Sequence, residues 1–576
     1  MKSCRHILLI IGLIIVTVPA YAVIDMRNAN FSQSWTDLVA PSGGYSLRIT
    51  RTYNSRSLHN GMFGFGWRTE FETSLRVTVD NTLRVHTGSG NEIVFLNNRS
   101  EQPNAGITAI MAAIRKRHPG RSQDYFNAIE RQLRIDPDLR DEMAKQLHLP
   151  ARVDRGVKYF AEGRADDTIV FNGTDYVRTF ANGSTQIFDR NGHLIRMGDR
   201  DGNYLRINRR NGLIVSVFDN TGKSLQFHYW PHTHYVSFVT GPDGMSSHYY
   251  YRGEDLVAVN NAKHQTYRYT YNKYENMTHV LFPDRTFEAM TYNNARDWIT
   301  SYRDRHGCLE RYAYDANPRD VNHYSSSVVK TCHNLVTNKS YFSFWYRNSK
   351  KGLYLAKTLA VVHRFIRVPV IEHGRHFVRT IAKTDTTETL YHPLFGSPIE
   401  IRHNNQVTRF AYYPDGNLKS KSSGNFSQVY SYDNSCHKLS ETVARFNERE
   451  PSSGRYHVKT ITTQFFYNAP RCNLTVVKNS DGQFAKIGYD YMGRISSIED
   501  QAKRLVLIKY NDQFGKPSLI IRPGLGAIRF TYNSNGSINR MAAVKHENLV
   551  TELQVANVFS NLVDLISPAT ADITNI

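Results

Sequence analysis

Tyrosines recur along this chain of 576 residues at nearly constant steps. One series steps by 22, 20, 21 and 22 residues, and a second series steps by 22, 21 and 22 residues. The two series are Tyr229, Tyr251, Tyr271, Tyr292 and Tyr314, and Tyr467, Tyr489, Tyr510 and Tyr532. A constant period of this length is typical of architectures in which one small unit is stacked many times. The chain is therefore expected to fold as a repeat protein.

The repeated unit consists of an aromatic residue, Asp or Asn, two polar residues, Gly and an aliphatic residue. It occurs as "FDRNGHL" from 188, "YDYMGRI" from 489 and "YNSNGSI" from 532. Asp or Asn together with Gly supplies the positive φ of a tight turn, and flanking alternation such as "SLQFHYW" is typical of strands. Each unit is therefore predicted to be a β-hairpin.

Hairpins of this kind must pair edge to edge, because a single hairpin is only marginally stable in water. From residue 168 to 541 the pattern predicts a mainly β fold, in which the hairpins join into one long, twisted antiparallel sheet. The recurring Tyr and Phe side chains are expected to form a continuous stripe on the inner face of this sheet.

Two segments depart from the strand pattern. Residues 98–167 are predicted to form a small α-helical insertion in a loop of the β framework. Residues 542–576 are predicted to hold a C-terminal helix, from about Val544 to Ile566, that covers the edge of the last strands. The helical signals of the insertion are a capping Ser122, Pro137 at a first helical position, and apolar residues at helical spacing, namely Ile107, Ile110, Met111 and Ile114.

Residues 1–22 have the pattern of a secretory signal peptide. Lys2 and Arg5 precede the apolar run 7–18, and Ala20-Tyr21-Ala22 supplies small residues for a cleavage site. A retained membrane anchor is the alternative, although the apolar run is short for a bilayer span. The pattern predicts a secreted or periplasmic protein with no transmembrane segment once the signal is removed.

An exported protein folds in an oxidising compartment, where paired cysteines form disulfides. Of five cysteines, Cys4 lies in the predicted signal peptide, so four remain. Three pairings of these four are possible, and short loops favour the pairing within each sequence-adjacent couple. The disulfide candidates are Cys308 with Cys332, and Cys436 with Cys472.

The chain carries a formal charge of +21, and removal of the two positive charges in the signal leaves 21 − 2 = +19. On an exported protein, this charge suggests attraction to anionic surfaces such as lipopolysaccharide, teichoic acid or phospholipid headgroups. A scattered basic surface that serves only solubility is the alternative. Nucleic acid is not an expected partner, because export separates the protein from it and no nucleic-acid-binding module is recognised.

The opening stretch, the period and the turn motif together resemble the Rhs/YD-repeat family. The resemblance rests on "LRITRTYNSRSLHNGMFGFGWRTEFETSL" from Leu47, "LRVHTGSGNEIVFL" from Leu83 and "DRDGNYLRI" from Asp199. It implies that residues 23–97 form an Rhs-type N-terminal β domain that opens a shell, and that the long sheet of residues 168–541 spirals into a partial or open YD-repeat shell. Toxin-carrying members have a tyrosine-rich "YDP" segment and an aspartyl autoproteolysis motif. Neither motif occurs in this sequence, so the resemblance does not imply toxin delivery.

The resemblance also suggests a role for the repeated Gly-Phe-Gly of the opening stretch. Its glycines would let the backbone bend tightly, while Phe63, Phe65 and Trp67 form a structural plug at the start of the spiral. An exposed aromatic platform for a ligand is the alternative interpretation of these three residues.

Chemistry-bearing motifs are scarce in the sequence. The Gly-x-Ser-x-Gly of a nucleophile elbow does not occur, no catalytic residue is assigned and no cofactor is expected. His363, His373 and His376, beside Glu372, form the local cluster that could bind a metal ion. The spacing of these histidines suits a strand less well than His-x-His, which places both rings on one face.

These observations predict a secreted or periplasmic, non-enzymatic YD-repeat scaffold or binding protein of the bacterial envelope. Its expected ligands are an anionic glycan, a lipid or a protein partner, and the helical insertion is the expected contact for a protein. The first alternative is a hydrolase with a site on the concave face of the sheet. The second is an orphan relative of a toxin shell that encloses a separate cargo.

Overall fold

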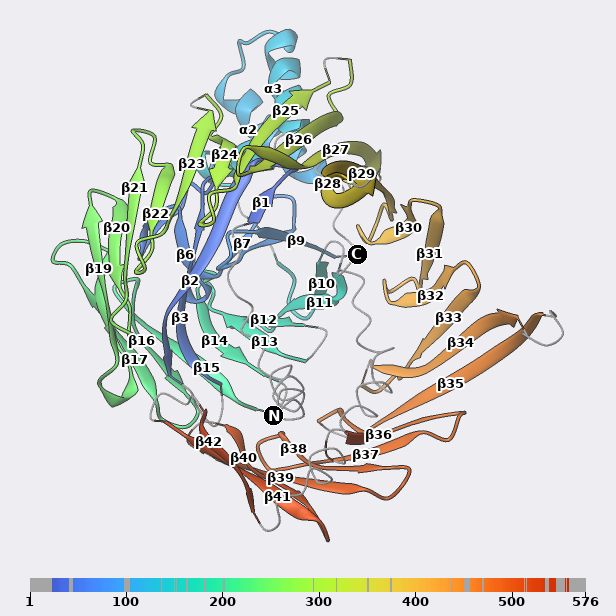
Figure 1. Ribbon diagram of the computed structural model, residues 1–576. Helices are drawn as coiled ribbons and strands as arrows, with labels where there is room; N and C mark the ends of the chain where they lie inside the picture. Colours follow the sequence, from blue (N-terminus) through green and yellow to red (C-terminus); the bar gives the residue numbers. More distant parts are fainter. Residues whose placement is uncertain are drawn as a thin grey trace.

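A computed structural model gives the architecture of the chain (Figure 1). It describes residues 23–544, Val555, Asn557 and Val558. Within the first range, the breaks are 41–44, 98–103, 136, 150, 152, 162–163, 181–182, 200–201, 294, 318, 350–351, 373–374, 437, 450–455, 469–470, 512, 514 and 534–537. The predicted signal peptide therefore lies outside the described residues.

Short strands open the described chain and form an N-terminal sheet of their own. β1, β2, β3 and β6 pair in that order, β4 and β5 form a small hairpin, and a 3-10 helix (Glu70–Glu72) follows. The strands are β1 (Val23–Asp25), β2 (Asn30–Ala40), β3 (Leu47–Asn54), β4 (Asn60–Gly61), β5 (Gly64–Phe65) and β6 (Trp67–Thr69).

The rest of the described chain builds one long antiparallel sheet, here called the wall, in which each strand from β7 to β42 pairs with the next. Helices α2 (Asn104–Arg117), α3 (Gln123–Ile135) and α4 (Pro137–Gln146) are inserted between β9 and β10, and these two strands still pair directly. The strands of the first half are β7 (Ser74–Val77), β8 (Leu83–His86), β9 (Glu92–Leu96), β10 (Lys158–Ala161), β11 (Arg164–Phe171), β12 (Tyr176–Thr179), β13 (Thr185–Phe188), β14 (Leu194–Gly198), β15 (Tyr204–Arg210), β16 (Leu213–Asp219), β17 (Ser224–Tyr229), β18 (Val236–Thr240), β19 (Ser246–Arg252), β20 (Asp255–Asn260), β21 (Thr266–Tyr271), β22 (Met277–Leu281), β23 (Phe287–Asn293), β24 (Trp298–Arg303) and β25 (Leu309–Ala316).

The second half of the wall contains the longest described strands, β27, β28 and β29. The hairpins β28–β29 and β34–β35 extend beyond their neighbours. The strands are β26 (His323–Cys332), β27 (Leu335–Ser349), β28 (Gly352–Glu372), β29 (Arg375–Tyr391), β30 (Pro398–His403), β31 (Gln406–Tyr412), β32 (Leu418–Ser423), β33 (Phe426–Tyr432), β34 (Leu439–Arg449), β35 (Tyr456–Asn468), β36 (Asn473–Asn479), β37 (Phe484–Tyr489), β38 (Ile495–Asp500), β39 (Leu505–Asn511), β40 (Lys516–Arg522), β41 (Gly526–Tyr532) and β42 (Ile538–Val544).

Figure 1 shows the wall curling around, so that the red strands β40–β42 approach the green strands β15–β17. Lys223 Nζ donates a hydrogen bond of 2.8 Å to the Gln513 carbonyl between these two regions. The predicted fold class, a mainly β, long antiparallel sheet that forms an open shell with a small helical insertion, is confirmed. The predicted C-terminal helix lies largely outside the described residues, but Val555 and Val558 are buried against the last strands.

Most of the nine repeat tyrosines share a structural role, which explains their constant spacing. Eight of them, all except Tyr314, stand where the register between two strands shifts by one residue, as at Tyr229 and Tyr510. In six of the nine, the hydroxyl donates to a backbone carbonyl 15 residues earlier, and so ties a strand to the hairpin before it. Examples are Tyr229 to Ile214 (2.6 Å), Tyr271 to Leu256 (2.8 Å), Tyr489 to Leu474 (2.9 Å) and Tyr510 to Ile495 (2.8 Å).

The turn of the unit is held by its acidic residue. Asp490 Oδ1 accepts hydrogen bonds from the backbone N–H groups of Met492 and Arg494, both at 2.9 Å. Gly493 follows with φ of 80°, a conformation that is costly for residues with a Cβ atom. The predicted hairpin turn thus owes its shape to a local side-chain acceptor and one glycine.

Removal of one repeat hydroxyl tests this role. We expect Tyr510→Phe to lower the free energy of unfolding by about 1 kcal/mol, because the buried end of the ring loses its bond to the Ile495 carbonyl. Thermal and urea unfolding followed by circular dichroism measure the change. Tyr491→Phe is the matched control, since Tyr491 is 72% exposed. Equal stability of the two variants would contradict the proposed role.

Candidate functional site

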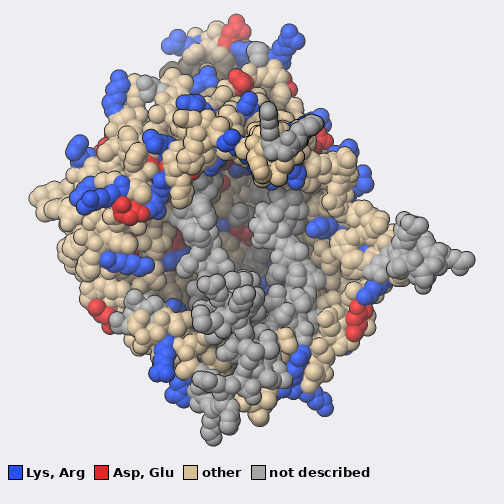
Figure 2. Space-filling model, viewed as in Figure 1, with Lys and Arg blue, Asp and Glu red and all other residues tan. Residues whose placement is uncertain are grey.

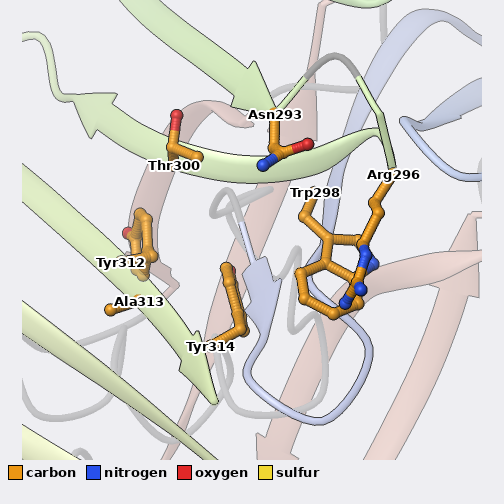
Figure 3. A pocket seen from close by; sticks show the side chains of 7 residues that line it. All are labelled: Asn293, Arg296, Trp298, Thr300, Tyr312, Ala313 and Tyr314. Atoms are coloured by element: carbon orange, nitrogen blue, oxygen red, sulfur yellow. The ribbon is translucent and has the colours of Figure 1, made fainter. Parts of the chain in front are cut away.

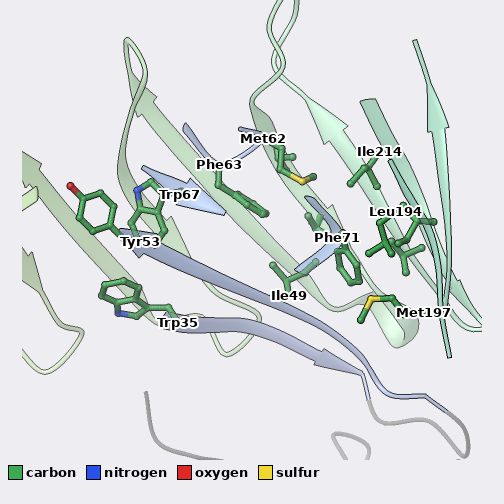
Figure 4. Close-up of a cluster of buried hydrophobic side chains, with 14 of the residues drawn as sticks. Trp35, Ile49, Tyr53, Met62, Phe63, Trp67, Phe71, Leu194, Met197 and Ile214 are labelled. Atoms are coloured by element: carbon green, nitrogen blue, oxygen red, sulfur yellow. The ribbon is translucent and has the colours of Figure 1, made fainter. Parts of the chain in front are cut away.

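The N-terminal sheet packs against the inner side of the wall. Figure 4 shows Trp35, Tyr53, Phe63 and Trp67 from the N-terminal strands beside wall residues such as Ile214. Phe63 and Trp67 are fully buried, and Phe65 is half-buried. Two of the predicted plug residues are therefore core residues of the junction between sheet and wall.

The Gly-Phe-Gly segment passes close to the backbone of the wall. Phe65 N–H donates to the Glu254 carbonyl at 3.0 Å. Gly64 has φ of 93°, and a Cβ atom there would lie 2.4 Å from that same carbonyl. The glycine is needed for this approach, because a side chain would collide with wall backbone that cannot move aside.

A buried ion pair lies at the centre of the junction. Arg51 is 0% exposed, and its Nε and one terminal nitrogen donate to the Asp37 carboxylate at 2.5 and 3.0 Å. Tyr249 donates to the same carboxylate at 3.1 Å, and Arg51 donates to the Tyr269 hydroxyl at 3.2 Å. The guanidinium also lies 4.5 Å from the centre of the Trp67 ring. Burial alone would lower the pKa of the Arg51 guanidinium. The favourable interaction with the Asp37 carboxylate has the opposite effect, and the pKa is raised overall.

Backbone groups of successive repeats complete the junction. The N–H groups of Val236, Met277 and Ile299 donate to N-terminal acceptors, which are the Met62 carbonyl (2.9 Å), the Tyr53 hydroxyl (2.9 Å) and the Ala29 carbonyl (3.2 Å). All three donors are the aliphatic residues that follow a hairpin turn of the repeat. The N-terminal sheet therefore binds the wall through backbone N–H groups that occupy the same position in three of its repeats.

A pocket of about 690 Å³, here called the inner pocket, lies between the N-terminal strands and strands β23–β27. Gln33 and Glu288 line it and are 5% and 6% exposed. Asp304, Glu310 and Lys330 also line it and are more exposed than those two. The remaining lining residues are Ile24, Met26, Phe282, Tyr302, Arg305, His306, Tyr312, Val328 and Phe342.

The carboxyl groups of the inner pocket differ in whether a lysine lies beside them. Lys330 Nζ lies 2.9 Å from Glu310 and 3.8 Å from Asp304, and Tyr312 donates to Glu310. Glu288 interacts with the neutral side chains of Gln33 and Tyr302, and its pKa is raised mainly by burial. Glu288 Oε2 and Gln33 Oε1 have no hydrogen-bond partner among the described residues.

A second, smaller pocket of about 290 Å³ adjoins Tyr312 and is lined by aromatic rings (Figure 3). The guanidinium of Arg296 lies 4.7 Å from the Trp298 ring, which meets Tyr314 edge to face at 5.2 Å. This pocket contains no carboxylate among its lining residues, and its polar groups are Asn293, Thr300, Arg296 and the tyrosine hydroxyls. It offers stacking surfaces without acid–base chemistry.

The structure separates two of the predicted metal ligands. His363 lies opposite Thr384, and the two side chains are hydrogen-bonded at 2.8 Å. His376 lies opposite Ile371, eight residues further along β28, which corresponds to about 26 Å at the rise of a strand. His373 lies outside the described residues. The described residues hold no group of three or more potential ligands that could bind a metal ion.

Both pairs of cysteines form disulfides. Cys308 is bonded to Cys332 and Cys436 to Cys472, which are the two pairings that short loops favour. The first bond connects the start of β25 with the end of β26, and the second connects the two ends of the long β34–β35 hairpin.

The hairpin β28–β29 extends beyond the wall. The register between β27 and β28 ends at Arg364, and the register between β29 and β30 begins at Thr387. Residues 365–382, here called the hairpin tip, therefore pair only with one another. Sequence analysis missed this feature, although the regular tyrosine spacing is interrupted between Tyr314 and Tyr391, before it resumes at Tyr412 and Tyr432.

The hairpin tip exposes apolar side chains. Ile371 is 64% exposed and Phe377 is 43% exposed. Ile366 pairs with Ile381 and Val370 with Phe377, and cross-strand partners project from the same face. Exposed cations accompany them: Arg364, Arg367, Arg379 and Lys383. Elsewhere Lys and Arg are spread over the visible surface (Figure 2).

The described helices include none that is long and apolar enough to cross a membrane. The helical insertion packs around a small core of its own and is held to the wall by a buried pair, with Arg140 Nε 2.8 Å from Asp80 Oδ2. Arg140 also donates to the Leu133 carbonyl, so one guanidinium connects two helices and the β7–β8 turn.

Residues 22–95 match the family described as Domain of unknown function (DUF6531). A search of the curated proteins gives no match. Among solved structures, the chain is similar to the Photorhabdus luminescens Tc holotoxin pore, with 12% identity over 90% of this chain and a TM-score of 0.30. It is also similar to TcdB2-TccC3 without its hypervariable C-terminal region, with 12% identity over 92% of this chain and a TM-score of 0.29. The chain spans 29% and 34% of the length of these two chains.

The buried ion pair gives a first prediction for this junction. We expect Arg51→Ala to lower the free energy of unfolding by about 3 to 5 kcal/mol, because it leaves the Asp37 carboxylate buried without its counterion. Lys459→Ala is the control, since the exposed Lys459–Asp481 pair should contribute less than about 1 kcal/mol. Urea unfolding and limited proteolysis measure both variants. Similar losses in the two variants would show that the junction is dispensable.

Asp255, beside the junction, gives a pH prediction. Burial, then Glu275 and Glu254, raises its pKa to about 6, whereas an unfolded Asp titrates near about 4. The protonated form is favoured in the fold, so the wild type should lose stability as pH rises from about 4 to about 6. Because the group is only half-buried, we expect Asp255→Asn to gain about 1 kcal/mol at neutral pH and nothing below about pH 4. Melting temperatures across pH test this, with exposed Asp315→Asn as control.

Proposed function

We propose that this protein is an exported scaffold of the Rhs/YD-repeat type that binds the anionic lipid surface of the bacterial envelope through its hairpin tip. The observation that carries the proposal is the exposed hairpin tip, which combines apolar side chains with cations. Large exposed apolar side chains that cluster in one segment mark interaction sites more often than scattered ones do. The wall then serves as the rigid body that presents the hairpin.

The composition of the hairpin favours a membrane interface over a purely polar ligand. From Arg364 to Asp385 the sequence contains five Lys or Arg residues and two acidic residues, Glu372 and Asp385, which gives 5 − 2 = +3. Asp385 lies within 4.0 Å of Arg364 and Lys383 at the base of the hairpin. Cations of this density are attracted to anionic headgroups, while residues such as Phe377 and Ile381 can enter the boundary between headgroups and acyl chains. An anionic glycan would satisfy the charge but would leave the apolar side chains in water.

Export supports this assignment. The predicted signal peptide and the two disulfides fit a secreted or periplasmic location, where thiols are oxidised. The mature chain would meet the envelope from this side.

Protein binding through the helical insertion stays a prediction. Among the described residues of the insertion, Tyr125 is the large apolar side chain with substantial exposure, and Arg121 lies beside its ring. The insertion therefore offers a smaller apolar surface than the hairpin tip does.

The hydrolase alternative is supported less well. A glycoside hydrolase needs two carboxyl groups that face each other across the substrate. In the inner pocket, Lys330 holds Asp304 and Glu310 together on one side. Glu288 is the remaining carboxyl group that lines the pocket, and it is buried.

Neutralising the cations of the hairpin tests the proposal. Arg364→Gln, Arg379→Gln and Lys383→Gln together should weaken binding to phosphatidylglycerol-containing vesicles about 100-fold, because each cation near an anionic surface contributes about 1 kcal/mol. Vesicle co-sedimentation at several salt concentrations measures the partition coefficient. Binding of the wild type to pure phosphatidylcholine vesicles should be weak.

A charge-matched control separates a local site from net charge. Arg268→Gln, Arg311→Gln and Arg529→Gln remove the same charge from exposed positions on other strands. This triple variant should retain most of the binding. Equal losses in both triple variants would assign the attraction to the scattered basic surface and overturn the proposed role of the hairpin.

A further inference from the structure

Glu288 is a buried carboxylate at a position that several repeats fill with an apolar residue. It stands four residues before the repeat tyrosine Tyr292. The corresponding residues before Tyr229, Tyr510 and Tyr532 are the buried Leu225, Val506 and Ile528, whereas other repeats have Ser247, Glu310 or Thr463 there. The wall can therefore be built at this position without a carboxylate, so the repeat itself does not require Glu288.

Two side-chain oxygen atoms at the buried end of the inner pocket lack a hydrogen-bond donor in the described part of the chain. Glu288 and Gln33 are both more than nine-tenths buried, and each has a side-chain oxygen without a partner among the described residues. Both oxygens are acceptors. Leaving such acceptors buried and unpaired is costly, so a ligand that enters here must bring donors.

The missing donor is best supplied by a cation. Lys330 lies within ion-pair distance of both Asp304 and Glu310, whereas no Lys or Arg lies within that distance of Glu288 in the part of the chain that the structure describes. Arg305, which also lines the pocket, is paired with Asp284 and acts on Glu288 only from a longer distance. A buried carboxylate without a counterion is stabilised strongly by a positive partner. Neutral hydroxyl groups would satisfy the hydrogen bonds but would leave the charge unbalanced.

The walls of the pocket indicate what carries the cation. Ile24, Met26 and Phe282 line it together with Val328 and Phe342. Its volume of about 690 Å³ falls within the range of small-molecule sites. We propose that the inner pocket binds an organic cation, an ammonium or guanidinium group on an apolar body, with Glu288 and Gln33 as its recognition groups.

This inference does not depend on the hairpin tip, which shares no residue with the pocket. The same chemistry could come from a free polyamine or from a basic side chain of a peptide. Both would place a positive group at Glu288 and an aliphatic stem along the apolar walls.

Calorimetric titration of the full mature chain tests the proposal with n-hexylamine, and with 1-hexanol as the uncharged probe of the same length. Hexylamine should bind at least ten-fold more tightly than hexanol. Glu288→Gln should weaken hexylamine binding at least ten-fold, whereas Glu254→Gln, which changes an exposed carboxylate outside the pocket, should leave it unchanged. Unaltered circular dichroism and melting temperature of E288Q would exclude a folding defect.

Spermidine and Nα-acetyl-lysine amide, titrated in parallel, distinguish the two sources of the cation, and tighter binding of either than of hexanol supports the proposal. Equal binding of hexylamine and hexanol would overturn it, as would binding of hexylamine that E288Q does not weaken. Methyl glucoside binding in place of the amines would show a site for hydroxyl groups instead. Failure of all probes to bind would also reject the proposal.

Discussion

The ion pair between Arg51 and Asp37 is the interaction on which the junction of the molecule depends. Repeat sheets are held by contacts between neighbouring units, so nothing in a single hairpin fixes how a long wall curves. The pair lies on the N-terminal sheet, yet Tyr249 and Tyr269 from two successive repeats each add a hydrogen bond to it. The Asp37 carbonyl also accepts from Ala262 N–H, so one residue connects the N-terminal sheet to several wall strands.

The same local irregularity serves both the wall and the junction. At repeat tyrosines such as Tyr229 and Tyr271, the register shift accompanies a hydrogen bond from the hydroxyl to the hairpin before it, and the aliphatic residue opposite presents its backbone N–H to the interior. Where the N-terminal sheet is present, these N–H groups bind it, as Val236 binds the Met62 carbonyl. The residue pattern that predicts a hairpin turn therefore also sets the spacing of the wall N–H groups that bind the N-terminal sheet.

Local signals predicted the parts of the fold that depend on near neighbours. Turn residues such as Gly493, the helices of the insertion and the short-loop disulfide Cys308–Cys332 all involve residues that are close in sequence. The partners of Arg51 could not be predicted, because Tyr269 lies 218 residues away and no local pattern links the two. His363 and His376 lie far apart for a related reason: closeness in sequence does not bring side chains together along extended strands, where each residue adds about 3.3 Å.

Departures from the repeat are therefore the most informative residues of this chain. An apolar residue four positions before a repeat tyrosine is sufficient for the wall, as Leu225 and Val506 demonstrate, so a buried Glu288 at that position lowers stability unless something compensates its charge. The hairpin tip is a second departure, since its strands extend past both neighbours and leave apolar side chains in water. Each feature is unfavourable for the isolated chain. Each becomes favourable only when a partner of the right chemistry is present, which is the physical reason for assigning binding to these two places rather than to the regular wall.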